Sequence, residues 1–183
     1  MRRLNAILTV MIMIFFVIHM IRGGLILTGM TSGGSAVFTG ITHLLMLTAA
    51  LHMMISILLT VQTVRACIRS GVSYPGWNRL FWVRRISGFS LILFMALHAM
   101  IFEGDVENGA YRLNLFGGVQ LAVNLLMVLS LLIHLSCNIG PLRISLGLED
   151  RKNVRLDILL VLSVLLLLAG IAFVVYYIRW SVF

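Results

Sequence analysis

The sequence predicts an all-α integral membrane protein, a single transmembrane domain built as a bundle of five helices. Of its 183 residues, 61% are hydrophobic and only 11% are charged, whereas soluble domains are about 45–50% apolar and about 25% charged. A membrane-spanning helix needs about 20 apolar residues. Five runs approach or exceed that length, at residues 4–21, 41–64, 86–102, 116–139 and 158–178. This composition excludes an ordinary soluble domain, a disordered segment and a nucleic-acid-binding module.

The first apolar run is interpreted as a retained helix and not as a signal peptide. It follows Arg2 and Arg3, as the apolar core of a signal would. However, it is longer than the usual core of about 7–15 residues, and Arg22-Gly23-Gly24 is no small-residue cleavage site. The other four runs are joined by short connections, so any soluble catalytic domain must come from other chains.

The connections contain turn-forming residues. Segment 23–40 is rich in Gly, Ser and Thr and is expected to be irregular, segment 74–77 is expected to form a turn, and segment 103–109 a short acidic loop. Gly140 and Pro141 are expected to end the fourth helix. Cys67 and Cys137, each near the end of a run, are expected to be reduced thiols.

The basic residues fall mainly on one side of the predicted bundle. Five alternating spans place eleven cations on the side of the N-terminus and three on the opposite side. Cytoplasmic connections carry the excess of Lys and Arg, so we expect a cytoplasmic N-terminus, an external C-terminus and a multi-pass location in the inner (plasma) membrane. The larger group is Arg2, Arg3, Arg65, Arg69, Arg79, Arg84, Arg85, Arg143, Arg151, Lys152 and Arg155, and the smaller is Arg22, Arg112 and Arg179.

All five histidines lie inside the apolar runs. Ionisable residues in a membrane interior are rare and usually functional. A neutral imidazole is a good axial ligand for haem iron, and helix bundles hold such cofactors between facing helices. We therefore expect a transmembrane haem b; the alternatives are histidines that only hydrogen-bond neighbouring helices, or a zinc or copper site, which no Cys or carboxylate accompanies. The histidines are His19, His43, His52, His98 and His134.

Depth along the helices indicates which histidines can share a haem at the outer side. A helix rises about 1.5 Å per residue, so residues at similar distances from the ends of their runs lie at similar depth. His19 precedes Arg22 by three residues, and His98 precedes Glu103 by five. These two positions predict an outer pair.

An inner pair is predicted from His52 and His134. His134 lies seven residues before Pro141, towards the inner end of its run. The second run offers His43 or His52, and His52 is nine residues deeper. Since His52 is still thirteen residues from Arg65, this pairing requires the second helix to project past the membrane.

The third run carries the string that is most specific to a family. Arg84-Arg85-Ile86-Ser87-Gly88-Phe89, with His98 downstream, resembles the Arg-x-Ser/Thr-Gly opening and downstream His of the cytochrome b anchors of succinate dehydrogenases and fumarate reductases. The whole chain is similar to the single-chain, five-helix, di-haem (type B) form. Helices one to four of that form each give one haem ligand, and helix five gives none.

The resemblance implies two haem b groups and their ligands. His52 and His134 would hold the inner haem, and His19 and His98 the outer one. His43 is surplus: it is either a structural or interfacial residue, or a polar group near the outer haem or quinone. The candidate partners for the haem propionates are Arg84, Arg85, Ser87 and Arg143. The alternative is that the arginines only set the membrane topology and that the serine is an ordinary helix residue.

The resemblance also implies an electron-transfer role. An iron–sulfur subunit and a flavoprotein subunit would dock on the cytoplasmic face, and the substrate in the membrane would be a quinone, for which we expect menaquinone. Fumarate reductases with a transmembrane proton path carry a Glu where this chain has Leu132, so protons are expected to exchange at the outer surface. Glu103 is the best-placed carboxylate for that exchange. The alternative is that Glu103 is only a solvated residue of an acidic loop.

Two other functions remain open at this point. The chain would use the same ligands as a cytochrome b anchor of another respiratory oxidoreductase, such as a hydrogenase, a formate dehydrogenase or a surface flavoprotein reductase. In a different class, it would be a haem-free membrane scaffold or assembly subunit whose histidines bond helices together.

Overall fold

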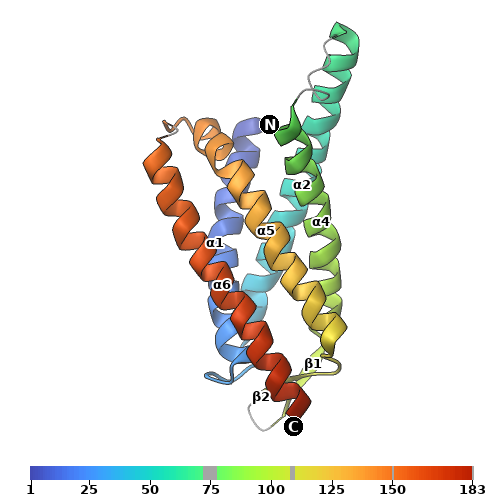
Figure 1. Cartoon of the computed structure of the whole chain (residues 1–183), viewed down its shortest axis with the longest axis vertical. Coiled ribbons are helices and arrows are strands. Elements are labelled where there is room, and N and C mark those ends of the chain that lie inside the picture. The colour runs from blue at the N-terminus through green and yellow to red at the C-terminus, as the bar shows by residue number, and fades with distance from the viewer. Residues whose placement is uncertain (72–77, 108–109, 150, 183) are drawn as a thin grey trace.

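The protein is a bundle of five long helices that run alternately up and down (Figure 1). The computed structural model describes residues 1–71, 78–107, 110–149 and 151–182; the turn expected at residues 74–77 lies outside them. Each helix is long and apolar enough to cross a membrane, which confirms the predicted all-α membrane bundle. The helices are α1 (Arg2–Leu27), α2 (Ala36–Ser70), α4 (Arg79–Ile101), α5 (Gly118–Ser145) and α6 (Lys152–Val182).

The up-and-down order separates the charges between the two ends of the bundle. The end that contains the N-terminus (Figure 1), here called the basic end, carries the eleven cations named above, and the sequence assigns three carboxylates to the same side. The opposite end, here called the hairpin end, carries three cations and three carboxylates. The net charge of +8 therefore belongs to the basic end.

Two predicted helix boundaries were wrong. The irregular connection between α1 and α2 is residues 28–35, because Gly23 and Gly24 remain helical, as a backbone in lipid must satisfy its own hydrogen bonds. Helix α5 also continues through Pro141 to Ser145. It ends before Gly147, whose φ of +80° is the left-handed conformation that terminates helices.

The acidic segment expected to be a loop forms a β-hairpin instead. Strands β1 (Gly104–Glu107) and β2 (Ala110–Leu113) pair antiparallel. A Cβ at Gly104 would collide with the backbone of Arg112, so the glycine permits this close pairing. The short segment gave too few alternating residues for the strand period to be read.

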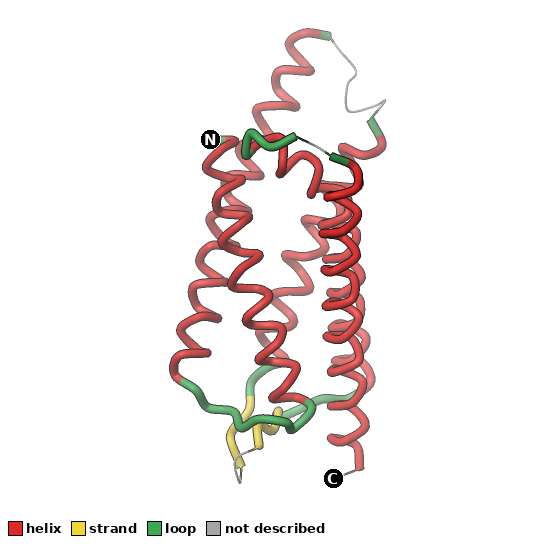
Figure 2. Tube along the Cα trace, turned by 90° about the vertical axis from the view of Figure 1, so that its left-hand side faces the viewer, coloured by secondary structure: helices red, strands yellow, loops and turns green. Residues whose placement is uncertain are grey.

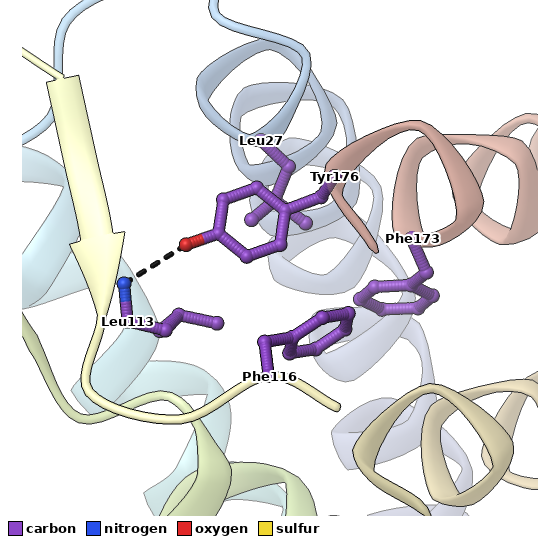
Figure 3. Close-up of a cluster of buried hydrophobic side chains, with 5 residues drawn as sticks. All are labelled: Leu27, Leu113, Phe116, Phe173 and Tyr176. Carbon is purple, nitrogen blue, oxygen red and sulfur yellow. Dashed lines mark hydrogen bonds between the residues drawn. The ribbon is translucent and has the colours of Figure 1, made fainter. Parts of the chain in front are cut away.

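The hairpin is fastened to the bundle by a buried cluster (Figure 3). The Tyr176 hydroxyl accepts a hydrogen bond from the backbone N–H of Leu113 at 2.9 Å, and the Trp180 indole donates to the Leu113 carbonyl at 3.2 Å. The cluster closes the hairpin end and fixes α6 against β2. Its members are Leu27, Leu113, Phe116, Phe173 and Tyr176.

The helices pack as two pairs. Helix α1 lies against α2, and α4 lies against α5, while α6 packs on α5 and α1. The pairs meet through α1 and α5. Over the described residues, neither α2 nor α4 makes an extensive backbone contact with the opposite pair. We call the region between the α1/α2 pair and the α4/α5 pair the central interface.

Candidate functional site

Four of the five histidines lie in two pairs across the central interface. The rings of His19 on α1 and His98 on α4 are 6.3 Å apart between centroids and inclined by 75°. His52 on α2 and His134 on α5 lie at the second level, beside Thr9 and Ser87 respectively. A metal ion bound by two imidazoles at about 2 Å from each nitrogen separates the ring centres by about 6–7 Å. The centroid distance of the outer pair falls within this range.

The outer histidine of α1 is oriented by a threonine of α2. Nδ1 of His19 lies 3.1 Å from Oγ1 of Thr42, and that hydroxyl donates its hydrogen to the Phe38 carbonyl at 3.0 Å. A hydroxyl has one hydrogen to donate. Thr42 satisfies both contacts when it accepts from His19, with the ring proton on Nδ1 and the lone pair on Nε2.

The outer histidine of α4 is oriented by an asparagine of α5. Nδ1 of His98 lies 2.7 Å from Oδ1 of Asn124, and the Asn124 amide nitrogen donates to the Gln120 carbonyl at 2.8 Å. Because the Asn124 amide nitrogen donates to Gln120, the Asn124 amide oxygen is the atom that faces the His98 ring. Asn124 is fully buried, so His98 also carries its proton on Nδ1.

The inner histidine of α2 is held by a threonine of α1. Nδ1 of His52 lies 3.1 Å from Oγ1 of Thr9, which donates to the Asn5 carbonyl at 2.9 Å. Thr9 satisfies both contacts when it accepts the Nδ1 proton. Nε2 of His52 faces Ser56 Oγ at 3.5 Å, at the limit of a hydrogen bond.

The inner histidine of α5 is held by the Ser-Gly pair of the third run. Nδ1 of His134 lies 3.1 Å from Oγ of Ser87, and that hydroxyl donates to the Arg84 carbonyl at 3.3 Å. A Cβ on Gly88 would stand 3.4 Å from Cε1 of His134. Ser87 therefore orients the ring, and Gly88 leaves room for it against α4.

All four histidines use the same ring nitrogen, Nδ1, for the contact with the partner helix of their pair. The tautomer that satisfies every one of these contacts carries its proton on Nδ1 and leaves on Nε2 the lone pair that a metal ligand needs. A hydrogen bond from the second ring nitrogen is the usual way in which a metal-binding histidine is fixed in tautomer and orientation. The donor set fits axial ligation of haem iron.

The two levels of histidines repeat a single arrangement. Each of the four helices carries one histidine and one acceptor, ten residues apart on α1, α2 and α5 and eleven apart on α4. At about 1.5 Å per residue this separates the two levels by about 15 Å. The pairs of positions are Thr9 and His19, Thr42 and His52, Ser87 and His98, and Asn124 and His134.

Helix α2 extends beyond the start of α1 at the basic end (Figure 1), which bears on the depth of His52. The Asn5 side chain donates to Ser56 Oγ at 3.2 Å, so Asn5 of α1 and Ser56 of α2 lie at the same depth. Asn5 is three residues from the start of α1, and Ser56 is four residues beyond His52. The remaining turns of α2 then pass beyond the start of α1, as Figures 1 and 2 show.

The other predicted site residues lie at the two ends of the bundle. Arg84 Nε donates to the Cys137 carbonyl at 2.9 Å, and the Arg85 guanidinium stacks 4.1 Å from the centroid of Phe81. Arg143 donates to the Glu149 carbonyl and so braces the turn after α5. Ser87 faces His134 and orients it, a role that sequence reasoning did not assign to it.

Two predicted residues stand apart from the histidine pairs. His43 is exposed on α2, one residue from Thr42 but turned to another side of the helix. Glu103 is exposed at the start of the hairpin, where its carbonyl accepts from the Asn114 N–H at 3.0 Å. Over the described residues, no three His, Cys, Asp or Glu side chains converge on one point.

Sequence reasoning missed three of the four orienting residues, Thr9, Thr42 and Asn124. The signal was present as polar residues inside apolar runs, each about ten positions from a histidine. Comparison of the chain with protein-family models, with curated proteins and with solved structures finds no match.

Proposed function

We propose that this chain is a haem b-containing membrane anchor that passes electrons between a cytoplasmic iron–sulfur/flavoprotein dehydrogenase and a membrane quinone. The observation that carries the proposal is the set of four histidines in two pairs, each with Nδ1 hydrogen-bonded to a side chain of a neighbouring helix. Histidines that served only to join helices would not need to use the same ring nitrogen at all four positions.

Each proposed haem would be held by one histidine from each helix pair. His52 and His134 would hold the inner group, and His19 and His98 the outer one. When bound, haem b supplies reversible one-electron transfer. The orienting hydroxyls and the Asn124 amide would hold the imidazole rings in place, so little rearrangement would be needed on binding.

The charge distribution supports the proposed orientation. The basic end would face the cytoplasm by the positive-inside rule, where the soluble subunits would dock. Two redox levels about 15 Å apart would divide a hydrocarbon layer about 30 Å thick into shorter steps. The quinone, for which menaquinone is our proposal, would react near the hairpin end, with Glu103 exchanging protons there.

The Arg-x-Ser-Gly string of the third run is the support for the choice of dehydrogenase. Its resemblance to the anchors of succinate dehydrogenase and fumarate reductase favours one of these as the soluble partner. An anchor of another respiratory oxidoreductase would use the same histidines, and its soluble subunits would then be different. A haem-free scaffold is the second candidate, because the four inter-helix hydrogen bonds also join α1 to α2 and α4 to α5.

Single histidine variants test the proposed ligands. We expect His52→Ala and His19→Ala each to lose one haem and keep the other, as measured by haem content and by the reduced-minus-oxidised spectrum of the purified chain. His43→Ala is the matched control on α2 and should keep both. Retention of two haems by both ligand variants would refute the assignment.

A further inference from the structure

Helix α2 is longer than a membrane span requires. Its 35 residues correspond to about 52 Å, against a hydrocarbon layer of about 30 Å. The 23 residues of α4 correspond to about 35 Å. Since both helices start or end at the hairpin end, the excess of α2 lies at the basic end.

The hydrogen bond between Asn5 and Ser56 fixes where the excess begins. Asn5 is three residues from the start of α1, so α1 begins level with residue 59 of α2. Residues 60–70, here called the projecting end of α2, lie beyond α1 by about 16 Å. Figure 1 shows this end rising above the other helices at the top of the view, and Figure 2 shows the same from the side.

One face of the projecting end is apolar. Val61, Val64 and Ile68 are spaced by three and four residues, which places them on one side of a helix. Val61 is 40% exposed and Ile68 75% exposed. In the proposed orientation Arg2 and Arg3, at the start of α1, would lie at the level of the lipid headgroups. The end of this apolar face would then stand beyond the hydrocarbon layer, where it is available to a partner.

The adjoining face is cationic. Arg65 and Arg69 are four residues apart and both exposed, so they form a second row beside the apolar one. They belong to the basic end, which holds the whole net charge of the chain. An apolar row flanked by a row of arginines is complementary to an apolar groove with an acidic rim.

We propose that the projecting end of α2 is the docking element for a water-soluble protein that presents such a groove. This deepens the proposed function, and rests on it, by naming the surface through which the soluble partner binds. The row of Val61, Val64 and Ile68 enters the groove, while Arg65 and Arg69 pair with carboxylates at its rim. The binding is therefore weakened by salt.

The native Cys67 reports on this surface. The chain has two cysteines, so a Cys137→Ser background leaves Cys67, inside the projecting end, as the single thiol. A membrane-impermeant maleimide is applied to inverted native membrane vesicles before and after a high-salt wash. We expect slow labelling before the wash and labelling faster by tenfold or more after it.

Two charge variants make the test specific. In the double variant Arg65→Gln with Arg69→Gln, Cys67 should be labelled rapidly before any wash. In Ile68→Ser, which removes an apolar contact with the groove, Cys67 should also be labelled rapidly. Lys152→Gln with Arg155→Gln removes two charges from the same end on another helix and should leave Cys67 protected. If Cys67 also loses its protection in this control, the protection depends only on the net charge of the basic end, and the proposal is overturned.

Equal labelling before and after the salt wash would also overturn it. So would protection of the purified chain in vesicles of anionic phospholipid alone, which would assign the surface to lipid headgroups. Haem content is measured on the same vesicles. A chain without haem that still shows salt-sensitive protection would refute the proposed function and leave the docking surface standing.

Discussion

Nδ1 of His98 lies 2.7 Å from Oδ1 of Asn124, across the contact between α4 and α5. The Asn124 side chain is fully buried, and its nitrogen is engaged by the Gln120 carbonyl, so the amide cannot turn its donor towards the ring. His98 is thereby fixed with its lone pair on Nε2. At the other three histidines a hydroxyl has the same role.

The first prediction concerns Asn124. Replacing it by Leu keeps the branching at Cγ and removes the acceptor of the His98 Nδ1 proton. Loss of such an orienting group typically weakens metal binding about 10–100-fold, so we expect that loss in haem affinity at the outer site alone, measured by haem titration of the apoprotein. Asn138→Leu is the control, because Asn138 donates only to the His134 carbonyl of its own helix; equal affinities in the two variants would contradict the orienting role.

The second prediction concerns the space that Gly88 leaves for His134. A Cβ there would already stand 3.4 Å from the ring, and the branched side chain of Gly88→Val would displace it. We expect about one haem per chain, with the inner haem lost. Gly40→Val is the matched control on α2, where a Cβ meets no atom within 4 Å. Two haems in Gly88→Val would show that the ring does not need this space.

The third prediction concerns the fastening of the hairpin. Tyr176→Phe removes the acceptor of the buried Leu113 N–H, and an unsatisfied buried donor costs about 1–3 kcal/mol. We expect the free energy of unfolding in detergent to fall by that amount. Tyr177→Phe removes the neighbouring hydroxyl and should change it little. A similar loss in both variants would mean that the hydrogen bond contributes nothing specific.

The fourth prediction concerns pH. Burial raises the pKa of Tyr111, and Tyr176, Asp105 and Glu103 add to the effect. Because the folded chain favours the protonated phenol, its contribution to stability is complete below the unfolded pKa of about 10. It is lost as the pH rises through the raised folded value, when the phenol can no longer donate to the Phe102 carbonyl.

Tyr111→Phe should remove that alkaline loss of stability. The measurement is thermal unfolding at a series of pH values around 10, with the phenolate absorbance followed in parallel. An unchanged alkaline profile in Tyr111→Phe would contradict the assignment.

The membrane architecture could be predicted because each span needs a long apolar run, and every run in the sequence became a helix. The ends of the helices could not, since a helix continues for as long as its backbone can be hydrogen-bonded. Thus Gly23 stays in α1, and α5 passes Pro141 and ends only before Gly147, where a left-handed residue is required.

The candidate site could be predicted only in part. Histidines in apolar runs are conspicuous, and their depths gave both pairs. Their acceptors are ordinary threonine, serine and asparagine residues, and which of them meets a ring depends on how two helices are rotated against each other. Thr9 hydrogen-bonds His52 although 43 residues separate them in the sequence. A contact over such a separation cannot be predicted from the local sequence.

The most direct test of the central claim is a count of haem on the purified chain. A dithionite-reduced minus oxidised spectrum, combined with a pyridine haemochrome assay, gives both the haem type and the number per chain. The two histidine pairs predict about two b haems. A preparation from haem-replete membranes that contains none would contradict the electron-transfer function and favour the haem-free scaffold.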